Sequence, residues 1–259
     1  MKILFIGDIV GQTGRDILKT QLKSIKKNNK IDFVIANGEN SAHGSGITEK
    51  ILREIIDSGV DVITSGNHIF KKKEAIDLVN KKENHLIIPA NYPEKIKANR
   101  TIEKVIDGQK VVVINLMGRV FMKEGLDCPF QKIDNLLTKI SYNAIIVVDF
   151  HGEVTSEKRA FGFYTDGKVT AVIGSHTHVQ TSDSEILPKG TAYITDAGMT
   201  GSVNSILGDK KESIINSFLT GLPFKLEPED HPAKLEGVII DIDDNTLKAE
   251  NIETIRVFE

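Results

Sequence analysis

Short runs of consecutive apolar residues alternate with segments of helical periodicity along most of the chain. The run AIIVVDF at 144–150 is the most apolar of them. A strand that is apolar at nearly every position, rather than at every second one, has to be covered on both faces. Interleaved with helices, such strands predict an α/β protein built in layers.

The turn and capping residues between these runs define the expected elements. Strands are expected at 2–6, 31–36, 60–64, 86–88, 144–150, 169–173 and 192–195. Antiparallel hairpins are expected at 101–115, around Asp107-Gly108, and at 235–257, around Asp244-Asn245. Helices are expected at 15–25, at 48–58 with Thr48 as N-cap, at 129–140 with Pro129 in the first turn, and at 209–219 with an Asp209/Glu212 capping pair. We predict an α/β fold, a layered α/β/β/α sandwich with mixed sheets, in which residues 1–259 form a single domain.

The composition narrows the class of protein. Of the 259 residues, 40% are hydrophobic and 27% are charged, which is typical of a globular protein and excludes disordered and coiled-coil classes. The net charge of −3 opposes a dedicated binder of duplex nucleic acid, because such a protein needs a basic surface.

The compartment is predicted from the single cysteine and the apolar runs. Cys128 alone excludes an internal disulfide and a cysteine-built zinc site, and it favours a reducing compartment. Every apolar run is shorter than the roughly 18 residues of a membrane span. The first run is broken at Gly7 and Asp8, too early for the core of a signal peptide. We therefore expect a cytoplasmic protein that spans no membrane.

Polar side chains collect where the expected strands end. They are Asp8, Glu39, Asn40, Asn67, His68, His151, His176 and His178. Ligands of open α/β sheets bind at the carboxyl ends of the strands, so we expect these side chains to converge. Imidazole mixed with carboxylate favours Zn, Fe, Mn or Co over Ca and Mg. So many donors exceed the needs of one tetrahedral ion and suit two ions, roughly 3.5–4 Å apart, bridged by a carboxylate.

Each of these residues also has an ordinary structural interpretation. Asp8 could cap the following helix, Asn40 could be a turn residue, and a lone strand-end histidine is more often hydrogen-bonded than ligating. The metal site is favoured because all of them fall at one sheet edge. Among the other histidines, His43 could touch a substrate, whereas His85 and His231 are expected to be structural or exposed.

The motifs resemble those of the calcineurin-like metallophosphoesterases: GD at 7–8, NGEN at 37–40, GNH at 66–68, the strand-end His151 and GSHTH at 174–178. More closely, the chain is similar to their YmdB-type branch of bacterial cyclic-nucleotide phosphodiesterases. Five further stretches resemble that branch: GDIVGQTGR, DFHGEVTSEK, THVQT, DAGMTG and the SILG segment. The resemblance covers essentially the whole length of the chain.

The resemblance implies a role for each strand-end residue. Asp8, Asn40 and His178 would hold one ion, Asn67, His151 and His176 the other, and Glu39 would bridge them. His68 would face the substrate as a proton donor or as a stabiliser of phosphoryl charge. The chain has Val10 where the wider superfamily has a ligating histidine, and its bridge comes from a glutamate in NGEN. Fe or Mn are the expected ions, with Zn as an alternative.

Three functions remain open from the sequence. The first is a phosphodiesterase in which a metal-bound hydroxide attacks a cyclic nucleotide, with 2′,3′-cyclic nucleotides leading and 3′,5′-cyclic nucleotides as the alternative. The second is a phosphomonoesterase or nucleotidase, which would want a basic clamp; the motif loops offer only Arg15, Lys158 and Arg159. The third is a metal-bearing regulatory protein with weak hydrolysis. An exposed hairpin edge also leaves room for a homo-oligomer.

Overall fold

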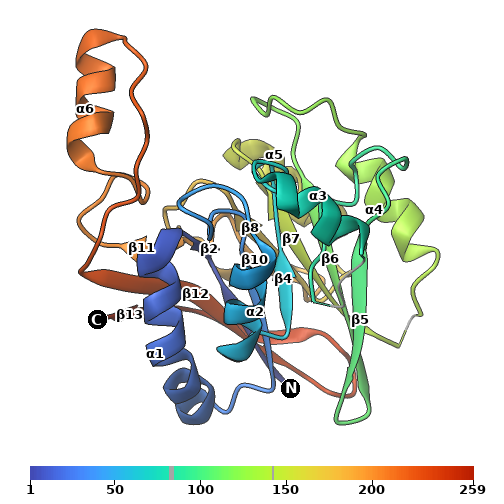
Figure 1. Cartoon of the computed structure of the whole chain (residues 1–259). Helices are drawn as coiled ribbons and strands as arrows, with labels where there is room; N and C mark the ends of the chain where they lie inside the picture. The colour runs from blue at the N-terminus through green and yellow to red at the C-terminus, as the bar shows by residue number, and fades with distance from the viewer. Residues whose placement is uncertain (82–84, 142) are drawn as a thin grey trace.

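The structure is a computed structural model that describes residues 1–81, 85–141 and 143–259 (Figure 1). Within these ranges the first sheet has the strand order β2-β11-β12-β1-β3-β4, with β13 paired to β12, and the second has the order β5-β6-β7-β8-β10-β9. The strands of the first sheet are β1 (Lys2–Ile6), β2 (Asp8–Ile9), β3 (Phe33–Asn37), β4 (Val62–Thr64), β11 (Met199–Ser202), β12 (Ala233–Ile242) and β13 (Ala249–Phe258). Those of the second are β5 (Thr101–Ile106), β6 (Gln109–Met117), β7 (Ile145–His151), β8 (Ala171–Ser175), β9 (Glu185–Ile186) and β10 (Ala192–Ile194).

Both sheets are mixed. In the first, β1, β3 and β4 are parallel, while β12 runs antiparallel to β1 and carries β13 as an antiparallel hairpin. In the second, β6, β7, β8 and β10 are parallel, and β5 and β9 are antiparallel edges. Within each sheet the carboxyl ends of the parallel strands therefore lie at one edge.

The two sheets pack face to face, and the alternation of side chains along β1 shows why. Ile3 and Phe5 pack in the core between the sheets, together with residues of β6, β7 and β8. Leu4 and Ile6 point the other way, into the core under the helices of the first sheet. Every one of these four side chains is fully buried, which explains the continuous apolar run.

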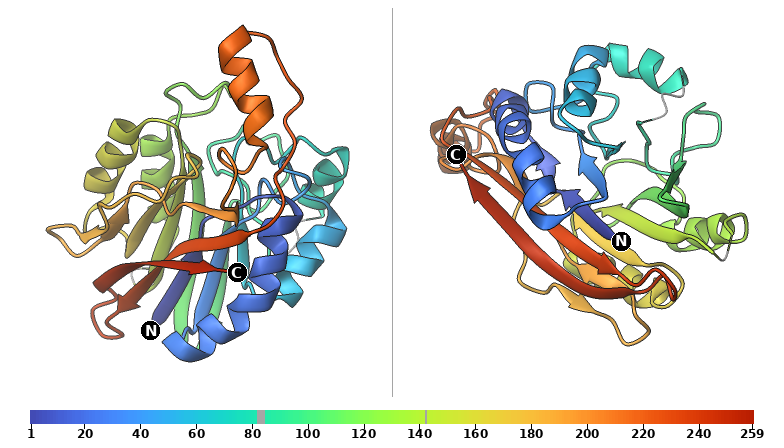
Figure 2. Two further views of the ribbon diagram at one scale, coloured as in Figure 1. Left: turned by 90° about the vertical axis from the view of Figure 1, so that its left-hand side faces the viewer. Right: turned by 90° about the horizontal axis from the view of Figure 1, so that it is seen from below.

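Helices cover the two outer faces. On the first sheet lie α1 (Gly11–Asn29), α2 (Glu49–Asp57) and α3 (Lys73–Asn80); on the second lie α4 (Pro129–Leu137) and α5 (Thr155–Thr165). The view from below shows α1 along the outer face of its sheet (Figure 2). Under α5, the rings of Phe161 and Phe150 stack with their centroids 4.3 Å apart. The predicted α/β/β/α sandwich with mixed sheets is thus confirmed, whereas the single domain stays a prediction.

The N-cap of α2 offers a stability test. The hydroxyl of Thr48 accepts a hydrogen bond from the backbone N–H of Ile51 at 3.4 Å, as predicted. Thr48→Ala should lower the free energy of unfolding by about 0.5–2 kcal/mol, because an orphan N–H of the first turn loses its acceptor. Thr48→Ser keeps the acceptor and should stay close to wild type in denaturant unfolding. Equal losses in both variants would show that the methyl group, not the cap, matters.

Some predictions of local structure are wrong. Residues 86–88 form only an isolated bridge, Ile63 to Leu86, because the chain turns away at Pro89, which has no N–H to donate to a strand. The Asp209/Glu212 capping pair is also wrong: Lys210 is the N-cap of α6 (Lys211–Thr220), without a side-chain cap bond. The helices α3 and α5, and the short strands β2, β9 and β11, went unpredicted.

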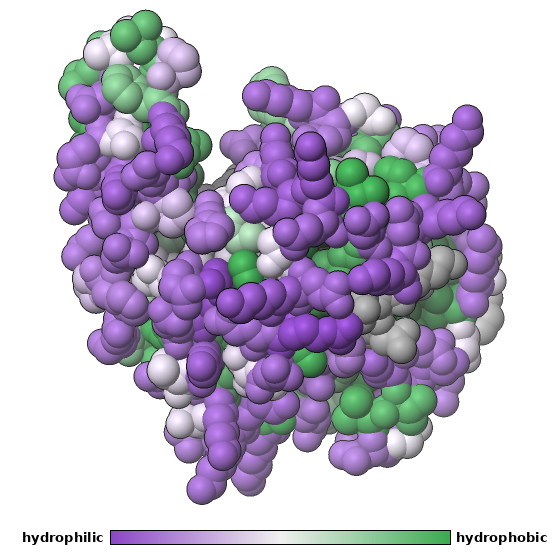
Figure 3. All heavy atoms as spheres, in the orientation of Figure 1, coloured by the Kyte–Doolittle hydropathy of each residue, from purple (hydrophilic) through white to green (hydrophobic). Residues whose placement is uncertain are grey.

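The helix α6 lies away from the sandwich, and the segments before and after it connect it to the body of the protein (Figures 1 and 2). Each of its residues is at least partly exposed, including Phe218 at 84% and Leu219 at 77%. Apolar atoms gather at its tip in the space-filling view, which also shows a hollow between this arm and the body (Figure 3). At the base of the arm, Leu207 and Leu226 line the same pocket as the predicted site residues.

Candidate active site

An open pocket of about 510 Å³ lies at the carboxyl ends of the parallel strands. Its wall contains five of the predicted site residues: Glu39, Asn40, His68, His176 and His178. The other three lie beneath or beside that wall: Asp8 and His151 are fully buried, and Asn67 contacts His151. The structure therefore brings all eight predicted residues together, as expected for side chains that follow neighbouring strands.

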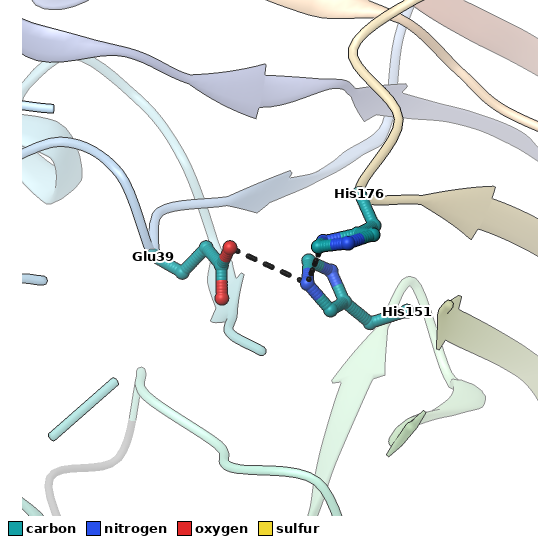
Figure 4. Close-up of side chains that lie close together, drawn as sticks. All are labelled: Glu39, His151 and His176. Carbon is teal, nitrogen blue, oxygen red and sulfur yellow. Dashed lines mark hydrogen bonds and ion pairs between the residues drawn. The ribbon is translucent and has the colours of Figure 1, made fainter. Parts of the chain in front are cut away.

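The first cluster of donor atoms surrounds His151, at the end of β7 (Figure 4). Its Nε2 lies 3.3 Å from Oε1 of Glu39 and 3.0 Å from both Nδ1 of His176 and Oδ1 of Asn67. The potential ligand atoms of Glu39, His151 and His176 all lie within 4.8 Å of one another. These donors are close enough to share one ion.

The second cluster lies on the other side of Glu39. Nε2 of His178 is 3.1 Å from Nδ2 of Asn40 and 3.7 Å from Oδ1 of Asp8. Nδ2 of Asn40 also donates to Oε1 of Glu39 at 3.2 Å, so Glu39 adjoins both clusters. Oδ1 of Asp8 is buried and has no hydrogen-bond partner among the described residues. A buried, unpartnered carboxylate oxygen near the Nε2 of an imidazole fits a cation.

Hydrogen bonds behind the imidazoles determine which nitrogen faces the clusters. The Ser175 hydroxyl donates to Oδ1 of Asp149 at 2.6 Å, so its oxygen accepts from Nδ1–H of His151 at 3.0 Å. Nδ1 of His178 donates to the carbonyl of Leu207 at 2.8 Å. When either ring is neutral, its lone pair is therefore on Nε2, the atom that faces the clusters.

His68 lies at the edge of the site with 31% of its side chain exposed. Its Nδ1 is 2.6 Å from Oδ1 of Asn40, and its backbone N–H donates to Oε2 of Glu39 at 3.0 Å. Burial lowers the pKa of His68, and the nearby His151 and Lys71 lower it further against the opposing effect of Glu39. His68 is thus held beside the clusters and still reaches the pocket.

The charged groups of the site shift one another's pKa values. Burial alone would raise the pKa of Glu39, but the imidazoles of His151 and His68 reverse this and lower it to about 2. Burial alone would lower the pKa of His151, but the Glu39 carboxylate raises it to about 9. Burial, followed by repulsion from His151, lowers the pKa of His176 to about 3, and burial raises the pKa of Asp8. Glu39 is therefore a carboxylate at neutral pH. A cation next to Asp8 would favour the charged form of Asp8 as well.

Gly66 gives the first cluster its space. A Cβ at this position would overlap Oε2 of Glu39 and Nε2 of His151. Any larger residue would therefore displace two of the three side chains in Figure 4. The GNH motif therefore needs glycine at position 66, because the side chains of Glu39 and His151 come close to its backbone.

Two of the basic residues named as a possible substrate clamp are used inside the protein. Arg15 is buried, and it donates to the carbonyls of Gly11 and Ser41 and pairs with Glu54 at 3.1 Å. Lys158 is also buried and pairs with Asp196. Arg159 pairs with Glu185. These cations hold loops and helices together.

The structure also places the other histidines and shows two acidic residues near the site. His43 lines the pocket, in line with a contact to substrate. His85 lies 2.9 Å from the carbonyl of Asp61, and His231 pairs with Glu259 at the surface. Sequence reasoning missed Glu153, whose Oε2 is 3.2 Å from Nε2 of His176, and Asp149 behind His151. Both lie within two residues of His151 in the DFHGE segment, and that proximity was the available signal.

This fold and this carboxylate–imidazole centre define a metallophosphoesterase-type hydrolase. The chain belongs to the YmdB-like protein family, whose model matches residues 4–255. A protein of Bacillus subtilis (strain 168) described as a 2′,3′-cyclic-nucleotide 2′-phosphodiesterase is 50% identical over 258 residues, covering 99% of this chain and 97% of that protein. The predicted family and the phosphodiesterase class of enzyme are confirmed.

Solved structures agree with this placement. A crystal structure of a hypothetical protein from Thermus thermophilus is similar with a TM-score of 0.94 and 36% identity, covering 100% of both chains. A structure described as a novel phosphatase from Mycoplasma pneumoniae has a TM-score of 0.93 and 36% identity, covering 100% of this chain and 93% of that one. Among the described residues, the helices are all too short or too polar to cross a membrane.

Proposed function

We propose that this protein is a dinuclear metal-dependent phosphodiesterase that hydrolyses 2′,3′-cyclic nucleotides. The observation that carries the proposal is the pair of donor clusters flanking Glu39, with the unpartnered Oδ1 of Asp8 beside them and His68 at the pocket edge. The substrate is supported by the name of the Bacillus subtilis relative.

The two clusters on either side of Glu39 support a site for two ions. In this proposal Asp8, Asn40 and His178 hold one ion, Asn67, His151 and His176 hold the other, and Glu39 bridges them. The mixture of imidazole, amide and carboxylate donors favours Fe or Mn, with Zn as the alternative. When bound, the ions supply an activated water and neutralise charge on the phosphoryl oxygens.

His68 supplies the proton in this scheme. Its Nδ1–H is oriented by Oδ1 of Asn40, which leaves Nε2 for the substrate. The lowered pKa of His68 favours the neutral ring in the empty pocket. A bound phosphodiester is negatively charged and raises that pKa again, so the ring can carry a proton to the leaving ribose oxygen.

A phosphomonoesterase is the second candidate, and the basic residues argue against it. A monoester carries one more negative charge than a diester and needs more positive charge from the protein. Arg15, Lys158 and Arg159 are engaged with Glu54, Asp196 and Glu185, so among the described residues Lys71 alone provides a lysine or arginine in the pocket wall. With metal-loaded enzyme, kcat/KM for bis(p-nitrophenyl) phosphate should exceed that for p-nitrophenyl phosphate by at least about tenfold, a difference of roughly 1.4 kcal/mol. The reverse ratio would establish the monoesterase instead.

A Gly66→Ala variant tests the first cluster. Because the added Cβ overlaps Glu39 and His151, we expect Mn²⁺ to bind at least tenfold more weakly and most of the turnover to be lost. The overpacking should also lower the free energy of unfolding by about 1–3 kcal/mol. Gly125→Ala is the matched control, since its Cβ would have nothing within 4 Å. Calorimetric titration of metal-stripped protein measures the affinity. Wild-type Mn²⁺ affinity in Gly66→Ala would place the ions elsewhere.

The proposal also includes where the protein is located, whether it forms oligomers and whether it has a regulatory role. The single cysteine, Cys128, supports a cytoplasmic location. The homo-oligomer stays a prediction. A regulatory role without hydrolysis would be favoured if a variant without turnover kept every cellular effect of the protein.

A further inference from the structure

A buried ion pair lies directly behind the loop that carries His176 and His178. Lys158, on α5, has 1% of its side chain exposed, and Asp196, after β10, has 0% exposed. Nζ of Lys158 and Oδ2 of Asp196 are 2.8 Å apart. Burying two charges often costs as much free energy as their attraction returns, so such a pair is weak evidence for stability alone. Its contacts indicate what else it does.

The pair holds the residues on both sides of His176. Nζ of Lys158 donates to the carbonyl of Ser175 at 2.7 Å. Oδ2 of Asp196 accepts from the backbone N–H of Thr177 at 3.0 Å and from its hydroxyl at 2.7 Å. The backbone on each side of His176 is therefore fixed by a charged, buried partner.

The loop held in this way has an unfavourable backbone. His176 has a φ of 101° and His178 a φ of 62°, in the left-handed region that L side chains rarely adopt. Such conformations persist only where the surroundings determine them. In an extended strand both imidazoles would point to the same face. Here His176 reaches His151 in the first cluster, whereas His178 reaches Asn40 in the second.

The same carboxylate also holds the segment next to Asp8. Oδ1 of Asp196 accepts from the N–H of Gly198 at 2.9 Å, and the carbonyl of Gly198 accepts from the N–H of Asp8 at 3.1 Å. A Cβ on Gly7 would overlap that carbonyl, so the two segments are in close contact. One buried charge thus connects the backbone of Asp8 with that of the histidine loop.

We propose that Lys158 and Asp196 are positioning residues that divide His176 and His178 between the two metal clusters and keep Asp8 in register with them. This inference rests on the metal site of the proposed function. Lys158 lies in the TSEK segment and Asp196 in the DAG segment, so the inference also gives these two segments a structural role.

The test compares a neutral pair with the wild-type pair. Lys158→Met or Asp196→Asn alone leaves an uncompensated buried charge and is expected to be strongly destabilised. The double variant K158M/D196N leaves neither charge and should unfold at a temperature closer to wild type than either single variant. Leu22→Ala, in the core under α1, is the control for stability loss without a contact to the loop. Thr177→Val is a second variant, which keeps both charges and loses only the hydroxyl bond to Asp196.

Two readouts are taken on metal-stripped protein: Mn²⁺ affinity by calorimetry, and the visible spectrum of the Co²⁺-loaded form, which reports ligand geometry. We expect the double variant to bind Mn²⁺ about 10–100-fold more weakly, as for other residues that orient metal ligands, and to show altered Co²⁺ bands. Thr177→Val should weaken binding in the same direction, and Leu22→Ala should match wild type in both readouts.

The outcomes separate this inference from the function on which it rests. Wild-type protein that binds no Mn²⁺ would overturn the metal site itself. If wild-type protein binds Mn²⁺, wild-type affinity and Co²⁺ bands in a folded double variant would show that the pair only stabilises the fold. Should the double variant not fold, wild-type affinity in Thr177→Val would contradict the positioning role.

Discussion

Replacing His68 with alanine is expected to lower kcat by about 10²–10⁴-fold while both metal ions stay bound, because a positioned general acid contributes that much. The imidazole contacts Asn40 and Glu39 but lies at the pocket edge, with 31% of its side chain exposed, outside both donor clusters. Steady-state kinetics on a 2′,3′-cyclic nucleotide and the metal content by elemental analysis measure the two effects.

The matched control for His68 is His231→Ala, which removes a surface imidazole paired with Glu259. It should keep wild-type kcat and metal content. If His68→Ala loses its metal ions along with its activity, His68 is a ligand and the assigned proton donor is wrong.

The second large effect is expected for Glu39→Gln. Glu39 is fully buried and adjoins both clusters, and its pKa of about 2 means that its charge is present at any neutral pH. The amide keeps the shape but removes the charge that bridging requires, so we expect the loss of at least one ion. Turnover should fall by at least about 10³-fold, more than the loss of a single hydrogen-bond donor to a transition-state oxyanion in a typical enzyme.

Metal content and kcat are measured together for Glu39→Gln. Glu103→Gln, on the exposed face of β5, is the control for removal of a carboxylate and should resemble wild type. Two ions bound at wild-type affinity in Glu39→Gln would show that this side chain does not bridge them.

The layered fold was predictable because its strands carry the signal at each position. Ile3 and Phe5 face one core, and Leu4 and Ile6 face the other. Because the strand is buried on both faces, its sequence is an unbroken apolar run. The convergence of Asp8, Glu39 and the histidines followed from the rule that parallel strands end at one edge. The structure brings these residues together, and their individual roles stay predictions.

The parts that were not predictable depend on contacts between distant segments. Lys158 and Asp196 are 38 residues apart, and local sequence patterns treat a lysine in a polar segment as exposed. The left-handed backbone at His176 lies between two residues, Ser175 and Thr177, that this distant pair holds. The expected strand at 86–88 failed for a local reason instead: the segment lies beside β4 at Ile63, but the chain turns away at Pro89 after a single bridge.

The most direct test of the central claim is hydrolysis of 2′,3′-cyclic AMP by metal-stripped protein, with and without added Mn²⁺. We predict turnover only when Mn²⁺ is present. Protein that rebinds Mn²⁺ and still leaves the cyclic nucleotide intact would contradict the proposed function, and the phosphomonoesterase and regulatory alternatives would then take its place.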